Sequence, residues 1–230
     1  INGLVWMGEK AYMQEQVQEK IDTGYNCIKL KIGAINFDEE IEILRSIREK
    51  FSADQIEIRV DANGAFHPDD AMDKLKTLAK FNIHSIEQPI KAGNWEDMAK
   101  LCRETPLPIA LDEELIGIYK FEDKVKLMKA IQPQYIILKP SLVGGFKGSQ
   151  EWIDIANEVK IPWWTTSALE SNIGLNAIAQ WAYTLNNPMP QGLGTGQLFT
   201  NNIGSPLEVS SGFLVYNQSK KWDLNEKLEA

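Results

Sequence analysis

Short apolar runs rich in β-branched residues alternate along this chain with amphipathic segments of roughly 10 to 15 residues, a pattern typical of alternating strands and helices. In the segment 38–50, Ile41, Leu44 and Ile47 recur on one face of a predicted helix, and a second helix is predicted over 68–80. Eight strands are predicted, the last more weakly than the others, at residues 4–7, 27–32, 56–60, 83–87, 109–111, 135–138, 162–166 and 191–194. The pattern predicts an α/β fold.

A charged side chain ends each of five consecutive predicted strands, namely Lys31, Asp61, Glu87, Asp112 and Lys139. A (β/α)8 barrel and a doubly wound open sheet share the same local alternation, but only the closed barrel brings the carboxyl ends of several strands to one point. An ionised group at the end of a buried strand is costly unless a counter-charge, metal or substrate meets it. We therefore predict a (β/α)8-type TIM barrel whose charged strand ends form an enzyme active site.

The length and composition are those of a single globular unit with one large core. The chain has 230 residues, of which 43% are hydrophobic and 24% charged. We predict a catalytic barrel domain over residues 1–200 and a C-terminal extension over residues 201–230. Because a predicted strand begins almost immediately after Ile1, we expect the chain to be a segment of a longer protein.

Charge and cysteine content narrow the range of partners. The formal net charge is -8 and no long block of lysine or arginine occurs, which argues against a nucleic-acid or anionic-membrane partner and favours a small-molecule substrate. Cys27 and Cys102 form no CxxC or Cys/His motif, so we expect two core thiols. No apolar stretch approaches the roughly 18 residues of a membrane span, and the first residues lack a signal-peptide layout, so a cytoplasmic location is expected.

Lys29 and Lys31 lie two residues apart on one predicted strand, so the pleat directs both side chains to the same face. Neighbouring ammonium groups lower each other's pKa, and a lysine with a lowered pKa can act as a general base. The alternative is a pair of surface lysines on an edge strand. Their common register with acidic strand ends favours the catalytic interpretation.

The carboxylates of Asp61, Glu87 and Asp112 come from consecutive strands and are typical ligands of a hard cation. We predict that they bind Mg²⁺, with Mn²⁺ as an alternative. Lys139, after the next strand, is expected to face Lys31 across the cavity. A divalent cation between lysines suits removal of a proton α to a carboxylate, because the cation stabilises the enediolate while a lysine accepts the proton.

Two further polar residues adjoin this group. Asn63 follows Asp61 by two residues and is a candidate to support the metal ligands or to contact the substrate. Glu113 is a candidate to orient one of the lysines. For both residues a surface position is a reasonable alternative.

The motifs KLK, VDANG, IEQP, LDE and LKPS, in this order and spacing, resemble the barrel domain of the enolase superfamily, in particular its muconate-lactonising-enzyme subgroup. The resemblance covers nearly the whole chain and implies a modified (β/α)7β barrel. It implies that Lys31 is first the base and then the acid, that Lys139 stabilises the enediolate from the other face, and that Lys29 tunes Lys31. The implied Mg²⁺ ligands are Asp61, Glu87 and Asp112.

Three segments, NGLVWMG, TSALESNIG and QGLGTGQLF, resemble more closely the members of this subgroup that work in menaquinone biosynthesis. The implied activity is that of a lyase, a metal-dependent syn dehydration of a succinylated hydroxycyclohexadiene carboxylate to an aromatic acid. The family places contacts to the succinyl tail at the ends of the seventh and eighth strands, where Ser167, Gly194 and Thr195 occur. For Ser167 the alternative is a helix cap.

Several other activities stay open. An N-acylamino-acid racemase or a muconate-type cycloisomerase would use the same lysines and acids. Dipeptide epimerases and mandelate-racemase-like members are disfavoured, because GLGTGQ replaces an Asp-x-Asp motif and because His67 and His84 are wrongly placed for a His-Asp dyad. In a different mechanistic class, Lys139 could form a Schiff base as in class I aldolases, with GLGTG as a phosphate loop.

The family's N-terminal α+β capping domain is absent from the sequence pattern of this chain. In the family this domain closes over the barrel mouth and excludes water, and residues 201–230 are expected to pack on it. The chain could therefore also be an inactive barrel segment that binds metal only. Oligomerisation is left open by the sequence.

Overall fold

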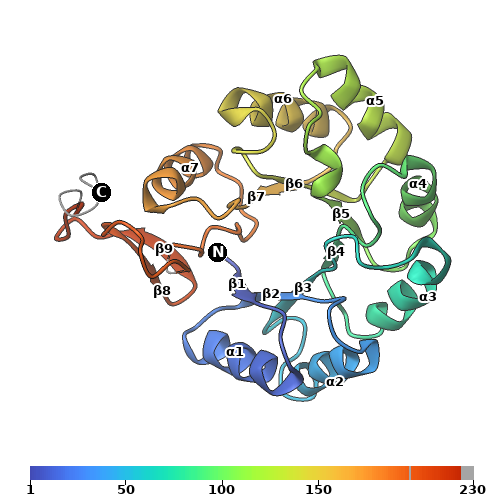
Figure 1. Ribbon diagram of the computed structural model, residues 1–230, viewed down its shortest axis with the longest axis horizontal. Coiled ribbons are helices and arrows are strands. Elements are labelled where there is room, and N and C mark those ends of the chain that lie inside the picture. The colour runs from blue at the N-terminus through green and yellow to red at the C-terminus, as the bar shows by residue number, and fades with distance from the viewer. Residues whose placement is uncertain (197, 224–230) are drawn as a thin grey trace.

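The computed structural model describes residues 1–196 and 198–223, in which seven strands form one curled sheet in chain order, every neighbouring pair being parallel. The strands are β1 (Gly3–Val5), β2 (Cys27–Lys31), β3 (Glu57–Asp61), β4 (Ser85–Glu87), β5 (Ile109–Leu111), β6 (Tyr135–Leu138) and β7 (Trp163–Thr165). The α-helices lie outside the sheet in the same order (Figure 1): α1 (Lys10–Asp22), α2 (Phe37–Arg48), α3 (Pro68–Ala79), α4 (Trp95–Glu104), α5 (Phe121–Ile131), α6 (Gly145–Glu158) and α7 (Asn172–Thr184). The arrangement is a β/α barrel, which confirms the predicted fold class.

The helices begin where the sequence supplies capping residues. Asn36 caps α2, since its side chain accepts a hydrogen bond from the Asp38 N–H at 2.8 Å. Pro68 lies in the first turn of α3, where a missing N–H costs nothing. Helix α2 then buries Leu44 and Ile47 against the sheet. None of the helices in the described part of the chain is long and apolar enough to cross a membrane.

The sheet closes through the segment that carries the weak eighth apolar run. Over the residues described, this segment forms no regular strand, but Gly192 makes a parallel bridge with Thr166, just beyond β7. On its other side the Asn2 N–H, just before β1, donates to the carbonyl of Gln191 at 2.9 Å. The strand predicted over 191–194 is therefore only a short bridge, because glycines in this stretch weaken a regular strand.

The amino-terminal half of the barrel interior is packed with large side chains. Arg59 and Trp164 are both 1% exposed, and the guanidinium carbon lies 4.2 Å from the centre of the indole. Arg59 Nη1 also donates to the carbonyl of Pro190 at 2.9 Å. His84 lies beside Tyr135 with ring centres 4.9 Å apart, at the end of the barrel opposite the charged strand ends. These contacts fill the barrel below the site, as the three-layer packing of such barrels requires.

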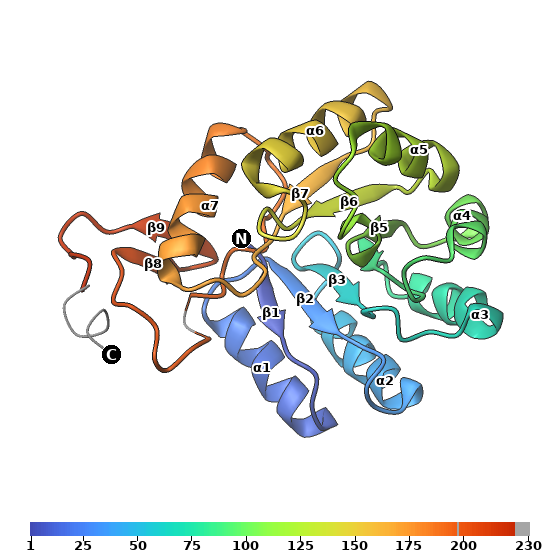
Figure 2. The ribbon, with the colours of Figure 1, turned by 45° about the horizontal axis from the view of Figure 1, so that its top comes forward.

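A C-terminal hairpin of β8 (Leu207–Ser210) and β9 (Phe213–Tyr216) lies between α7 and α1 in both views of the ribbon (Figures 1 and 2). Leu214 packs against a small cluster of apolar residues on α7, and the Ile1 ammonium donates to the carbonyl of Gly212 at 2.8 Å. The hairpin thus occupies the place of an eighth barrel helix. The expected contact of 201–230 with a capping domain stays a prediction, and residues 224–230 lie outside the described residues.

Closure of the barrel predicts that Gly192 cannot accept a side chain. A Cβ at this position would lie 2.1 Å from Thr166 Oγ1 and 2.7 Å from Thr166 Cβ. We expect Gly192→Ala to lower the free energy of unfolding by about 1–3 kcal/mol in urea denaturation. Tyr183, which is 85% exposed, provides the control, and Tyr183→Ala should change this free energy by less than about 0.5 kcal/mol. Equal stability of the two variants would contradict tight closure at this position.

Candidate active site

The strand ladders align the charged strand ends. Lys31, Asp61 and Glu87 are the last residues of β2, β3 and β4, and the ladders pair Lys31 with Asp61 and Asp61 with Glu87. Asp112 and Lys139 directly follow the last residues of β5 and β6. The three acids are only 1–2% exposed, at 1%, 2% and 1% in chain order. The register predicted from the sequence is therefore confirmed for Lys31, Asp61 and Glu87, whereas Glu87 pairs with Ala110, two residues before Asp112.

Lysine side chains contact each of these buried carboxylates. Lys29 Nζ donates to Glu87 Oε2 at 2.7 Å and to Asp61 Oδ2 at 3.2 Å. Lys31 Nζ donates to Asp61 Oδ2 at 3.0 Å, and Lys139 Nζ contacts Asp112. Each acid of the predicted metal site thus has a cationic partner within the barrel.

The electrostatics of Lys29 differ from the sequence-based expectation. Burial disfavours its charge, but Glu87 and Asp61 outweigh burial and raise its pKa. The prediction that Lys29 and Lys31 lower each other's pKa is therefore wrong for Lys29. The spacing along the sequence placed Lys31 next to Lys29, but it did not show that Glu87 and Asp61 surround the Lys29 ammonium. Burial likewise opposes the charge of Asp61, but the two lysines prevail and lower its pKa to about 2.

The predicted metal ligands are not gathered around one point. Among the residues that the structure describes, no three acidic, histidine or cysteine side chains form a group that could hold a metal ion. Lys29 instead lies between Asp61 and Glu87, while Lys139 contacts Asp112. The assignment of these acids as metal ligands stays a prediction.

The donor set nevertheless fits a hard cation. Glu87 Oε1 is buried and accepts no hydrogen bond from a described residue. Burial and the nearby Glu87 raise the pKa of Asp112 well above its ordinary value, even though Lys139 is in contact with it. Buried carboxylate oxygens that are incompletely neutralised are the environment that a divalent cation stabilises.

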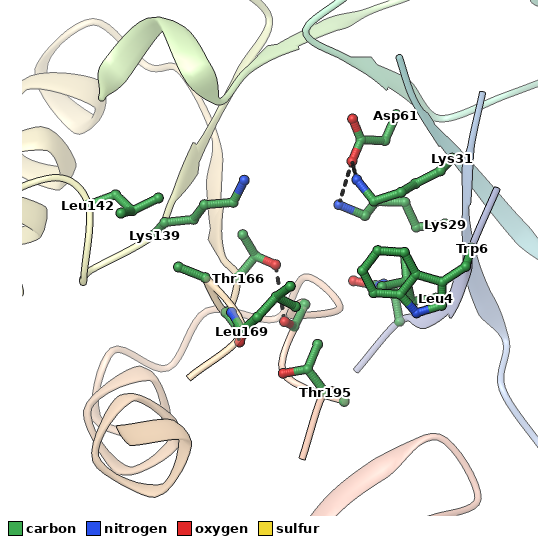
Figure 3. Close-up of a pocket in the computed structure, with 15 residues that line it drawn as sticks. Leu4, Trp6, Lys29, Lys31, Asp61, Lys139, Leu142, Thr166, Leu169 and Thr195 are labelled. Carbon is green, nitrogen blue, oxygen red and sulfur yellow. Dashed lines mark hydrogen bonds and ion pairs between the residues drawn. The ribbon is translucent and has the colours of Figure 1, made fainter. Parts of the chain in front are cut away.

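A cavity of about 250 Å³ opens beside these residues (Figure 3). Lys31 and Lys139 enter it from opposite sides, as the sequence predicted for the two lysines, and Asp61 lies beside Lys31. Residues of the seventh and eighth strand ends complete the wall, among them the predicted substrate contacts Ser167, Gly194 and Thr195. Glu87 and Asp112 do not line the cavity.

Asn63 and Glu113 form a chain of contacts behind Lys31. Asn63 Oδ1 accepts from Lys31 Nζ at 2.6 Å, and Asn63 Nδ2 donates to Glu113 Oε1 at 2.8 Å. Both residues lie outside the cavity lining. They are therefore placed to orient Lys31, Asn63 by direct contact and Glu113 through Asn63.

The loop after β7 is organised by Glu170. Glu170 Oε2 accepts from Ser167 Oγ at 2.7 Å and from the Ala168 N–H at 2.9 Å, while Glu170 Oε1 contacts Ser141, in the loop after β6. Ser167 is not the cap of α7, because the N-cap position is Ser171. The helix-cap alternative for Ser167 is therefore wrong, and its hydroxyl instead holds the cavity loop together.

Sequence reasoning missed several residues of the site. Leu4 on β1 and Trp6, directly after β1, line the cavity, as does Leu169, which adopts a positive φ of 67°. Alternation along β1 could have indicated Trp6, whereas nothing in the sequence signals the backbone of Leu169. Gln88 was also missed: its buried side chain accepts from the N–H of Asp112 at 3.3 Å and so braces the end of β5.

The barrel and its lysine-flanked acids are the features that the sequence motifs predicted for a member of the enolase superfamily. A comparison with protein families identifies the same family. The family described as Enolase C-terminal domain-like matches residues 12–219. The chain belongs to this family, within the enolase superfamily, which confirms the resemblance drawn from the sequence motifs.

Comparison with individual proteins shows which members of the family the chain resembles. The chain is 59% identical over 214 residues to the o-succinylbenzoate synthase of Desulfotalea psychrophila, covering 93% of this chain and 58% of the relative. It is 31% identical over 195 residues to an N-succinylamino acid racemase of Amycolatopsis, covering 84% of this chain and 51% of the relative. The chain therefore spans little more than half the length of these curated relatives.

Solved structures show the same likeness. The crystal structure of MenC from Desulfotalea psychrophila matches with a TM-score of 0.87 at 57% identity, covering 93% of this chain and 59% of that chain. Muconate lactonizing enzyme from Pseudomonas fluorescens, complexed with muconolactone, matches with a TM-score of 0.83 at 27% identity, covering 93% of this chain and 57% of that chain. The barrel fold is thus shared with enzymes of more than one name.

The contacts of Lys29 predict a large effect on folding. Lys29→Met removes the charge that faces two buried carboxylates, so we expect the free energy of unfolding to fall by roughly 3–5 kcal/mol in the presence of a chelator. Lys76→Met is the control, because Lys76 and its partner Asp73 are 60% and 86% exposed, and exposed pairs contribute at most about 1 kcal/mol. Urea denaturation followed by circular dichroism measures both. Similar losses in the two variants would contradict the role assigned to Lys29.

Proposed function

We propose that this chain forms the catalytic barrel of an o-succinylbenzoate synthase, a lyase of menaquinone biosynthesis. The reaction is the metal-dependent syn dehydration of a succinylated hydroxycyclohexadiene carboxylate to o-succinylbenzoate. The observation that carries the proposal is the 59% identity to the Desulfotalea psychrophila synthase over 93% of this chain. The cavity supports it, since two lysines reach one substrate-sized space from opposite sides.

Lys31 is the general base in this proposal. It removes the proton from the ring carbon that carries the carboxylate, and the electron pair of that bond passes into an enediolate. The enediolate then collapses, the bond to the ring hydroxyl breaks, and Lys31 returns its proton to the departing oxygen on the same face. One water leaves, the ring becomes aromatic and Lys31 regains its starting protonation state.

The remaining charged residues stabilise the enediolate. Lys139 faces the cavity opposite Lys31 and places positive charge on the other face of the substrate. Asp61, Glu87 and Asp112 would hold Mg²⁺, or Mn²⁺ as the alternative. When bound, the cation neutralises the charge that develops on the substrate carboxylate. Lys29 contacts Asp61 and Glu87 together and so fixes the orientation of two of these acids.

Substrate recognition is assigned to the other side of the cavity. Ser167 holds its loop in place through Glu170, and Gly194 and Thr195 line the same cavity. Thr195 Oγ1 is buried and has no hydrogen-bond partner among the described residues, so it is free to meet a polar group of the substrate. A small carboxylate in a cytoplasmic enzyme is the expected ligand, with a capping domain of the longer protein closing the cavity.

Turnover of the cyclohexadiene carboxylate by the full-length protein tests this proposal. Formation of o-succinylbenzoate is followed by absorbance, and we expect a chelator to abolish it and Mg²⁺ to restore it. Lys31→Ala should reduce kcat by at least on the order of 10²-fold, because it removes the base. Lys76→Ala, on an exposed part of α3, is the matched lysine control. Turnover that is insensitive to the chelator or to Lys31→Ala would overturn the mechanism.

An N-succinylamino acid racemase is the second candidate. The 31% identity to the Amycolatopsis racemase favours it, together with the positions of Lys31 and Lys139 on opposite sides of the cavity. Racemisation requires both lysines to exchange protons with the substrate, whereas in dehydration only Lys31 transfers protons and Lys139 acts through its charge.

Lys139→Ala separates the two activities. We expect the variant to lose racemisation of N-succinylamino acids by on the order of 10²-fold or more, because a two-base reaction loses one of its bases. Exchange of the α-proton with solvent deuterium, measured by NMR, should persist in the enantiomer whose proton Lys31 removes, at a reduced rate because the Lys139 charge that stabilises the enediolate is lost. Loss of exchange in both enantiomers would contradict separate roles for the lysines.

A further inference from the structure

Trp6 forms one wall of the cavity, directly beside Lys31 (Figure 3). Leu4 pairs with Lys29 in the β1–β2 ladder, and side chains alternate along a strand. Trp6, two residues after Leu4, therefore follows it on the same face and comes next to Lys31. The centre of the Trp6 ring lies 5.7 Å from Lys31 Nζ, within the range of a cation–π contact.

The indole completes an enclosure around the Lys31 ammonium. Asp61 Oδ2 and Asn63 Oδ1 contact Nζ at 3.0 and 2.6 Å, and Trp6 lies over it. The Lys31 side chain is only 14% exposed as a result. A lysine has a flexible four-carbon stem and loses considerable rotamer entropy when it is held in one place, so a rigid aromatic neighbour restricts the alternatives.

The backbone of Trp6 needs its own support. The residue lies beyond Val5, the last residue of β1, where the strand ladder no longer holds the chain. Gln16 on α1 supplies the missing contacts, because the Trp6 N–H donates to Gln16 Oε1 at 2.9 Å and Gln16 Nε2 donates to the Trp6 carbonyl at 3.0 Å. A side-chain amide presents one acceptor and one donor side by side, the complement of a peptide group. Gln16 is 8% exposed, so both bonds are shielded from water.

We propose that Trp6 is a positioning residue for Lys31, and that Gln16 acts at one remove by fixing the backbone of Trp6. The proposal rests on the proposed function, in which Lys31 is the base. In this proposal helix α1, on the outside of the barrel, helps to hold Lys31 in the position from which it transfers the proton. Both residues act through Lys31 in this proposal, because Trp6 contacts Lys31 and Gln16 contacts the backbone of Trp6.

Kinetics of variants in the full-length protein provide the first test. Trp6→Ala should lower kcat on the order of 10²-fold and Gln16→Ala on the order of tenfold, with KM within about twofold of the wild type, because a misplaced base slows proton transfer without weakening binding. Trp6→Phe should recover most of the loss, since it keeps an aromatic face over Lys31. Gln18→Ala is the matched control on the same helix, because Gln18 is exposed and, among the residues that the structure describes, its side chain hydrogen-bonds only Asp22, at 2.8 Å.

Chemical labelling of Lys31 provides a readout that does not require turnover. The rate of modification by trinitrobenzenesulfonate, measured by peptide mass spectrometry, is normalised to the exposed Lys76. We expect modification of Lys31 to accelerate several-fold in Trp6→Ala and Gln16→Ala, and to stay near the wild-type rate in Trp6→Phe and Gln18→Ala. Circular dichroism establishes that each variant is folded.

The two readouts distinguish failure of this proposal from failure of the proposed function. Faster labelling in a protein that does not dehydrate the cyclohexadiene carboxylate supports the positioning role and rejects the assigned reaction. Unchanged labelling and unchanged kcat in Trp6→Ala overturn the positioning role. A raised KM with unchanged labelling also overturns it, because Trp6 would then contact the substrate and not Lys31.

Discussion

The buried contact of Lys29 with Asp61 and Glu87 is the interaction on which the rest of the site depends. Both carboxylates are at most 2% exposed, and their charges would be costly in the barrel interior without a cation between them. The three residues come from β2, β3 and β4, so the contact also fixes the strand ends relative to one another. Lys31 is positioned as a consequence, since it shares Asp61 with Lys29.

A second constraint is that side chains must fill the barrel interior on the amino-terminal side of the site, while a cavity stays open on its carboxyl-terminal side. Arg59 and Trp164 fill the amino-terminal half, and Arg59 also contacts the segment that joins β7 to β1. The same residues therefore exclude water beneath the charged strand ends and hold the closure in place. Gly192 permits that closure, because the bridge with Thr166 leaves no space for a Cβ. The hairpin between α7 and α1 covers the seam from outside.

The sequence predicted the strands and the register of the charged strand ends, since both depend on local periodicity and on one residue at each strand end. It failed where the outcome depends on side chains from distant segments. The raised pKa of Lys29 follows from Glu87, which lies 58 residues away in the chain. The role of Trp6 depends on an amide from α1, and the eighth strand is lost because glycines leave only a bridge. Contacts between residues that are far apart in the chain leave no periodic pattern in the sequence.

The cavity is divided between two groups of elements, and this division bears on how relatives with different names share one barrel. Lys31, Asp61 and Lys139 come from the ends of β2, β3 and β6, whereas Ser167 and Thr195 come from the loop after β7 and the closing segment. Under the proposed function the first group supplies the base Lys31, the stabilising charge of Lys139 and the metal ligand Asp61, and the second group meets the substrate tail. The second group is held by side-chain contacts such as Ser167 with Glu170 and not by strand ladders. Changes there can alter the substrate without disturbing the base.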